Sequence, residues 1–272
     1  MRELLTGMVE SNMSTMFTDV NEKTSEIAAQ VGRTPQNWNI SVFSMIQNLS
    51  ESVVVPIAGI IITLVLCYEL ISMLTERNNL HDVDTWMFFK YFVKAWVAIY
   101  LVSNTFTITM AVFDVGQSVV NSASGIINGE TAIDVSSLSM QMQAAMATME
   151  IGELVVLALE TFLVSFCMKI MSVVITVIVY GRMIEIYLYT SLAPIPFATM
   201  SNREWGHVGT NYFRGLFALA FQAFLMMVCV AIYAALISSV RISSNMHSAL
   251  IGVAAYTVIL CFSLMKTGRL SK

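Results

Sequence analysis

The sequence predicts an all-α fold: a polytopic bundle of membrane-spanning helices with an amphipathic helix at its N-terminus. Hydrophobic residues make up 57% of the 272 residues and charged residues only 12%, whereas about a quarter of a soluble domain is charged. The mean hydropathy is +0.73, and several apolar runs are long enough to cross the ~30 Å hydrocarbon core of a bilayer. This composition excludes a soluble enzyme domain, a disordered chain and a basic nucleic-acid-binding domain. The net charge of −4 is too small to define a partner.

Residues 1–52 are mixed in polarity, and we expect them to form an external amphipathic segment. Apolar residues recur there at helical spacing up to a break at Gly32–Pro35: Leu4, Leu5, Met8, Met16, Phe17, Val20, Ile27 and Val31. The charged face of this helix is acidic, which disfavours docking on anionic lipid. Two interpretations stay open: it binds a partner helix or neighbouring subunit, or it caps its own protein.

Residues 53–272 are predicted to form the transmembrane domain. The predicted spans are about 53–74, 88–113, 151–180, 215–240 and 248–265. Asp84 has the position of a helix N-cap before the second span. The third span is about 45 Å long at ~1.5 Å per residue, so it must tilt or project beyond the bilayer. Between the second and third spans, 114–150 contains no Lys or Arg, and a polar helix is expected over 135–149.

The segment 184–200 decides between five and six spans. Ala193, Pro194 and Pro196 interrupt it, and two prolines two residues apart stop a regular helix. If the segment enters and returns without crossing, nine basic residues share one side of the membrane. Because basic residues concentrate on the cytoplasmic side, the five-span topology fits better. It places the N-terminus outside and the C-terminus inside the cytoplasmic membrane.

Lys169 is the most informative single residue. It lies thirteen residues before Arg182, which is about 20 Å along a helix and near the middle of a bilayer. A charge at that depth costs at least ~2.5–3.5 kcal/mol and should face water or a partner. Glu69 is the nearest candidate carboxylate by depth. Two interpretations stay open: Lys169 lines a hydrated lumen, or it makes a buried structural pair.

The other charged residues in the spans favour structural roles. Glu153 and Glu160 share a helix face and suggest a solvated extension of the third span; a proton relay would need a histidine that the sequence does not place beside them. Arg182 and Glu185 form an i, i+3 pair at the inner interface. Basic and aromatic residues near the ends of spans are expected to be interface anchors: Lys90, Lys94 and Trp205.

The motifs of common membrane enzymes are missing from the sequence. There is no Walker motif, no HExxH and no GxSxG, so the residues for nucleotide hydrolysis or metalloprotease chemistry are lacking. The cysteines all lie inside apolar runs without a C-x-x-C pair, which favours packing over a metal site: Cys67, Cys167, Cys229 and Cys261. We expect no enzymatic activity, no cofactor and no metal.

One part of the sequence is similar to a known family. The residues Arg182–Tyr187, then Leu192–Thr199, then Gly206, Gly209 and Tyr212–Arg214 resemble the core of the TrbL/VirB-type polytopic membrane subunits of type IV secretion and conjugation systems. Without a large C-terminal domain, the sequence is similar to the short family members of Gram-positive conjugative elements. The resemblance extends over roughly residues 50–270, and its most telling part is 180–225.

The resemblance implies a membrane-embedded channel or scaffold subunit that is not an enzyme. Members of this family contact other secretion subunits, including cytoplasmic ATPases, and help form the path for a DNA–protein substrate. We expect copies to pack into a homo-oligomeric ring, with Lys169 and the broken segment lining or bracing the lumen. A small-solute transporter or channel component is the alternative, and an intramembrane enzyme using Glu69, Glu153 or Glu160 is a third possibility.

Overall fold

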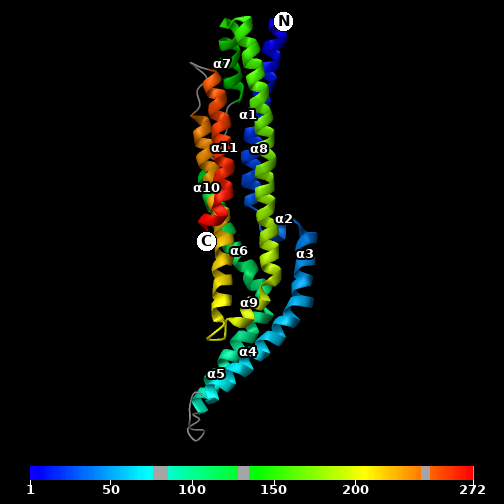
Figure 1. Cartoon of the computed structure of the whole chain (residues 1–272), viewed down its shortest axis with the longest axis vertical. Coiled ribbons are helices and arrows are strands. Elements are labelled where there is room, and N and C mark those ends of the chain that lie inside the picture. The colour runs from blue at the N-terminus through cyan, green and yellow to red at the C-terminus, as the bar shows by residue number, and fades with distance from the viewer. Residues whose placement is uncertain (76–84, 128–134, 240–245, 272) are drawn as a thin grey trace. The chain divides into compact units, whose positions relative to one another are not determined.

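The computed structural model describes residues 1–75, 85–127, 135–239 and 246–271, with side chains except at 124–127 and 135–139. Over these ranges the chain is helical and has no β-strand, which confirms the predicted all-α class. Figure 1 shows the elements in chain order: α1 (Arg2–Val31), α2 (Pro35–Trp38), α3 (Ile40–Leu49), the π-helical turn η1 (Ser50–Val54), α4 (Val55–Thr75), α5 (Thr85–Ser103), α6 (Thr105–Ile127), α7 (Val135–Thr148), α8 (Ile151–Leu192), α9 (Pro194–Thr199), α10 (Gly206–Ser238) and α11 (Met246–Leu270).

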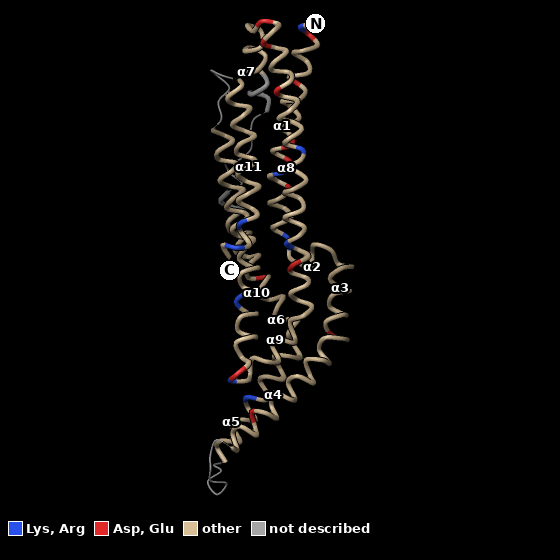
Figure 2. Tube along the Cα trace, viewed as in Figure 1, with Lys and Arg blue, Asp and Glu red and all other residues tan. Residues whose placement is uncertain are grey.

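Among the described residues, five helical stretches are long and apolar enough to cross a membrane. They are Ile40–Thr75, Thr85–Ser103, Ile151–Leu192, Gly206–Ser238 and Met246–Leu270. Charged residues are sparse along the trace (Figure 2). The chain is therefore an all-α polytopic membrane protein, as the composition predicts.

The helix that contains the first predicted span extends beyond it toward the N-terminus. It starts at Ile40 rather than 53, so the helix passes through the expected boundary between residues 52 and 53 without a break. Its irregularity is the π-helical turn η1 just before Pro56. Proline has no N–H to bond the carbonyl four residues earlier, and a local π turn is a common adjustment to such a disruption.

The second predicted span is divided into α5 and α6 at Asn104. Backbone bonds continue through the junction, but the side chain of Asn104 also donates to the Tyr100 carbonyl at 2.9 Å. The Thr105 hydroxyl donates to the Leu101 carbonyl at 2.8 Å. Side chains that bond back to helix carbonyls tend to bend the helix, which explains the junction.

The third stretch is longer than predicted. Helix α8 has 42 residues, which is about 63 Å at ~1.5 Å per residue. It continues through Arg182 to Leu192, where the sequence suggested a broken segment from 184. The break comes one residue before Pro194, whose ring disfavours a continuing helix in the residues before it.

The chain divides into two compact units. The first contains Met1–Gly32, Ser118–Gly181 and Gln222–Ser271, and the second contains Arg33–Gln117 and Arg182–Phe221. The core of the first unit joins α1 to α8, α10 and α11, with Met16, Leu157, Met226 and Leu250 among its fully buried side chains. In the second unit, α4, α5 and α9 pack around Ala58, Ile62, Ala95, Ala98, Phe197 and Ala198.

Helix α1 has one buried side, and it ends at the predicted break. Five of the apolar residues that the periodicity selected are buried: Met16, Phe17, Val20, Ile27 and Val31. Leu4 and Met8 are exposed instead. After Gly32, Thr34 caps α2 by accepting from the Asn37 backbone N–H at 3.2 Å, and Pro35 occupies the first helical position, as expected for a helix start.

The helix expected over 135–149 is present as α7 (Val135–Thr148). The link that contains His81 and the expected N-cap Asp84 lies outside the described residues, as does Arg241.

Candidate functional site

The Lys169 side chain is exposed on α8 and forms no hydrogen bond or ion pair with any described residue. The carboxylate that the sequence suggested as its partner is engaged elsewhere, because Glu69 of α4 forms an ion pair with Lys94 of α5 in the second unit. Within the part of the chain that the structure describes, Lys169 is therefore a cation without a partner in the middle of a candidate span.

The position of Lys169 on α8 follows from two hydrogen bonds between α1 and α8. The Ser165 hydroxyl donates to the Asn12 carbonyl at 3.5 Å, and the Lys23 ammonium donates to the Thr176 hydroxyl at 3.3 Å. Each pair is separated by 153 residues, so α1 and α8 run parallel and in register. Lys169 lies four residues after Ser165 and seven before Thr176, which places it on the side of α8 that faces α1.

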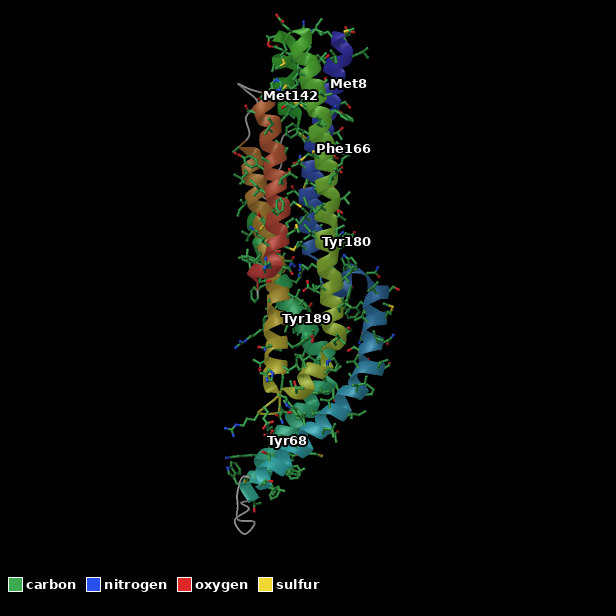
Figure 3. All side chains as sticks on the ribbon, in the orientation of Figure 1. Met8, Tyr68, Met142, Phe166, Tyr180 and Tyr189 are labelled. Carbon is green, nitrogen blue, oxygen red and sulfur yellow. The ribbon has the colours of Figure 1, made fainter. Side chains whose placement is uncertain are left out.

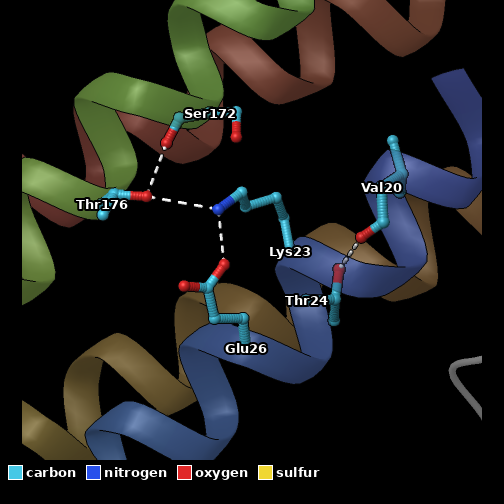
Figure 4. A network of polar contacts seen from close by, with 6 residues as sticks. All are labelled: Val20, Lys23, Thr24, Glu26, Ser172 and Thr176. Carbon is cyan, nitrogen blue, oxygen red and sulfur yellow. Dashed lines mark hydrogen bonds and ion pairs between the residues drawn. The ribbon is translucent and has the colours of Figure 1, made fainter.

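Lys23 connects the two helices through a small polar network (Figure 4). Its ammonium pairs with the carboxylate of Glu26 on the same helix and also reaches the Thr176 hydroxyl. That hydroxyl in turn donates to the Ser172 carbonyl at 3.0 Å. The charge of Lys23 is therefore satisfied, unlike that of Lys169.

A groove opens beside this network inside the first unit. It lies between α1, α8, α10 and α11 and is lined by Asp19, Lys23, Thr24, Met168, Ser172, Ile175, Tyr233, Thr257 and Leu260, among others. The hydroxyls of Tyr233 and Thr257 bond each other at 2.8 Å in its wall. Polar groups thus follow the inner side of α1 through a bundle of otherwise apolar helices.

Glu160 has a histidine partner that the sequence did not reveal. In the first unit the imidazole Nδ1 of His247, at the start of α11, lies against a carboxylate oxygen of Glu160 on α8. The two residues are 87 positions apart, and no local spacing connects them. The lone histidine next to the start of the last predicted span was the available signal.

Glu153 has a local structural role. Its carboxylate accepts from the Glu150 backbone N–H at 3.1 Å, one residue before α8 begins. This is the returning half of a capping box, which satisfies a free N–H at a helix start. The contact agrees with the structural interpretation of Glu153.

The broken segment is a packing element of the second unit. Ala193 and Pro194 are buried at the junction of α8 and α9, and Pro196 is partly buried. Helix α9 then packs against α4 and α5 through Phe197 and Ala198. The break lets the chain turn Phe197 into that core.

The predicted Arg182–Glu185 pair does not form an ion pair. The Arg182 side chain is 7% exposed, and its guanidinium donates to the Leu219 carbonyl at 3.4 Å and contacts the Met183 sulfur at 3.9 Å. Its Nε has no partner among the described residues. The guanidinium bonds a carbonyl of α10 rather than pairing with Glu185, although the charge of Glu185 still acts on it.

The predicted interface anchors have specific contacts. Lys90 lies over the Trp86 ring, 5.6 Å from its centroid, and Lys94 pairs with Glu69. Trp205 stacks on Tyr68, a residue labelled in Figure 3, with 5.8 Å between ring centroids. The Tyr68 hydroxyl also donates to Glu204 at 3.0 Å, which fixes the turn between α9 and α10 to α4.

Comparison with protein-family models decides the family. The TrbL/VirB6 plasmid conjugal transfer-like model matches residues 20–194, well over half of the chain. The chain belongs to the TrbL/VirB6-like family. No curated protein and no solved structure matches it. As a member of this family, the protein is a conjugal transfer subunit of a type IV secretion system, and other subunits of that system are its partners.

The TrbL/VirB6-like match differs in extent from the resemblance drawn from the sequence. It begins within α1 and ends at Pro194. It therefore includes Lys169 and the Arg182–Tyr187 stretch but excludes Gly206, Gly209 and Tyr212–Arg214. The part of α1 that bonds Thr176 lies inside the matched region.

Proposed function

We propose that this TrbL/VirB6-like protein is a channel or scaffold subunit in the cytoplasmic membrane, and that several copies surround a shared path for a DNA–protein substrate. The observation that carries this proposal is Lys169, an exposed cation within a candidate span that has no partner among the described residues. Hydrocarbon does not tolerate such a group, so it needs water or a partner. A lumen between copies provides water.

The outer side of α8 supports an assembly of several copies. Large apolar side chains are exposed along it, including Leu159, Phe166, Val173 and Val177. Helix α8 is about 63 Å long, so even a tilt of 40° would leave part of it outside the ~30 Å hydrocarbon core. Neighbouring subunits would pack against the exposed apolar side chains on the part of the helix that lies outside the hydrocarbon.

The first unit supports an outside N-terminus and an inside C-terminus. At one end, the Arg2 guanidinium donates to the Ala147 carbonyl at 2.7 Å, just before α8 begins. Helix α11 starts beside Glu160 of α8, and its later residues Thr257 and Leu260 line the same groove as Met168 and Ile175 of α8, so it runs in the same direction as α8. The N- and C-terminal ends of the chain therefore lie at opposite ends of this unit.

The turn between α9 and α10 is suited to bind a cytoplasmic partner. The Asn202 side chain accepts from the backbone N–H groups of Glu204 and Trp205 at 2.7 and 3.0 Å, which holds the turn in one shape. Arg203 is exposed beside them. The turn carries one cation and one carboxylate, Arg203 and Glu204, and the carboxylate accepts from Tyr68. With its shape fixed and Arg203 exposed on the inner side, it offers a contact to an ATPase of the secretion machine, and the protein would act there without chemistry of its own.

The proposal is tested by conjugative transfer from donor cells that carry Lys169→Leu, Lys169→Arg or the matched control Lys266→Leu. Lys266 is also exposed but lies near the C-terminal end of α11. We expect Lys169→Leu to lower transfer at least about tenfold at normal protein levels. Lys169→Arg should transfer normally, because arginine keeps the positive charge that the hydrated site accommodates. If Lys169→Leu supports normal assembly and transfer, a role in the lumen is excluded.

A further inference from the structure

The outward side of α1 carries a regular polar stripe. Its members follow each other at alternating spacings of four and three, and all are exposed: Ser11, Thr15, Thr18, Glu22 and Ser25. This spacing keeps them on one face of a helix. The same face continues into the apolar residues Leu4 and Met8 before the stripe and Ala29 after it. From Ser11 to Ser25 the stripe contains four neutral hydroxyl side chains and one carboxylate.

The stripe lies at the depth of the candidate spans. The buried side of α1 packs into one core with α8, α10 and α11, and all three belong to candidate spans. The register of 153 residues between Asn12 and Ser165, and between Lys23 and Thr176, extends along the helix. Thr18 is therefore level with residue 171, and Ser25 with residue 178.

The outward side of α8 has the opposite character at the same depth. Ile170 and Val177 are 45% and 65% exposed, and they suit lipid or an apolar neighbour. Glu22 on α1 does not, because an exposed carboxylate in hydrocarbon is strongly disfavoured. One unit thus has an apolar side and a polar side, and the unpaired Lys169 is located where they meet.

We infer that the outward face of α1 from Ser11 to Ser25 is the water-exposed wall of the path that copies of this protein surround, at the depth of the spans rather than in an external segment as the sequence suggested for residues 1–52. The inference rests on the proposed function and adds the residues that line the path. The occupant of the face is water. Neutral hydroxyls hydrate well without binding a passing chain tightly, and Glu22 with Lys169 gives the wall one charge of each sign.

The test uses the full chain in assembled donor membranes, with Cys67, Cys167, Cys229 and Cys261 replaced by Ala. Single cysteines are placed at Thr18→Cys and Ser25→Cys on α1, and at the depth-matched controls Ile170→Cys and Val177→Cys on α8. A membrane-impermeant, thiol-specific methanethiosulfonate is applied to each side of the membrane, in spheroplasts and in inverted vesicles. We expect at least about tenfold faster labelling on α1, because the reactive thiolate forms in water and not in hydrocarbon.

Each outcome gives a decision. Fast labelling on α1 with slow labelling on α8 supports the wall. Slow labelling on both helices means that α1 is covered by protein, such as a second copy, and overturns the inference. Equal, fast labelling on both means that the unit stands outside the hydrocarbon and also overturns it. The proposed function is tested by a different experiment, the conjugative transfer of donors that carry Lys169→Leu. It can therefore fail or hold independently of how α1 is labelled.

Discussion

Gly209 of α10 and Pro196 of α9 approach so closely that a Cβ at position 209 would lie 2.6 Å from the Pro196 carbonyl oxygen. The same Cβ would lie 2.1 Å from the Met200 Cγ. The absence of a side chain at 209 is therefore the feature that lets α10 pack against the proline-broken segment. Both residues belong to the stretch that resembles the family, and their contact explains why that stretch has a glycine at position 209.

Gly209→Ala should destabilise the protein. Backbone must move to accept the added methyl, and overpacking of this kind costs about 1–3 kcal/mol. Gly252→Ala on α11 is the matched control, because nothing lies within 4 Å of its Cβ position and alanine favours helix more than glycine. Thermal unfolding in detergent compares the two. A Gly209→Ala variant as stable as Gly252→Ala would contradict the packing described.

Reversing the charges of Glu69 and Lys94 should preserve the ion pair between α4 and α5. Both side chains are partly exposed, so we expect each single change, Glu69→Lys or Lys94→Glu, to cost roughly 1 kcal/mol, mainly from like-charge contact. The double reversal should recover most of that loss. A double-mutant cycle on the free energy of unfolding measures it. Additive losses would show that the pair does not contribute.

Arg182→Met should leave stability unchanged or raise it. The guanidinium is buried with one weak carbonyl contact and an unpartnered Nε, and an apolar side chain of similar length removes that desolvation cost. Arg182→Ala should instead lose about 2–4 kcal/mol by leaving a cavity. Unfolding of both variants in detergent is the measurement, and a marked loss of stability in Arg182→Met would refute the expectation.

Glu160 and His247 should be energetically coupled across α8 and α11. A cycle of Glu160→Gln, His247→Asn and the double variant should give an interaction free energy of about 0.5–2 kcal/mol. Glu153→Gln is the control, because the Glu153 carboxylate bonds only the helix start and should show no coupling to position 247. Coupling near zero for Glu160 would mean that the contact is incidental.

The presence and position of most helices were predictable from the sequence, because apolar runs and prolines such as Pro35 and Pro194 determine helix extents through neighbouring residues alone. The break at Gly32–Pro35 and the helix over 135–149 required only spacing and caps. The helix that contains the first predicted span begins earlier than the span itself, since residues 40–52 are less apolar than residues 53–74 but the helix continues through both. Asn104 divides the second span by hydrogen bonds from side chains, for which the apolar run gave no signal.

The site was less predictable because its contacts join distant parts of the chain. The partner of Glu160 is 87 residues away, and Glu69 pairs with Lys94 rather than Lys169. Arg182 and Glu185 had suitable spacing, but the guanidinium bonds the Leu219 carbonyl of α10 instead of forming an ion pair with Glu185. The polar stripe of α1 could have been found from its spacing, yet its importance depends on α1 packing beside α8.

Single-particle imaging of the purified protein in a lipid nanodisc is the sharpest test of a ring that surrounds a hydrated path. We predict a cyclic ring with a central opening, in which Lys169 and the Ser11–Ser25 face of α1 point to the opening and the Leu159–Val177 face of α8 points away from it. A compact monomer, or a two-fold dimer without a lumen, would contradict this arrangement and favour a small-solute transporter or a subunit without a path of its own.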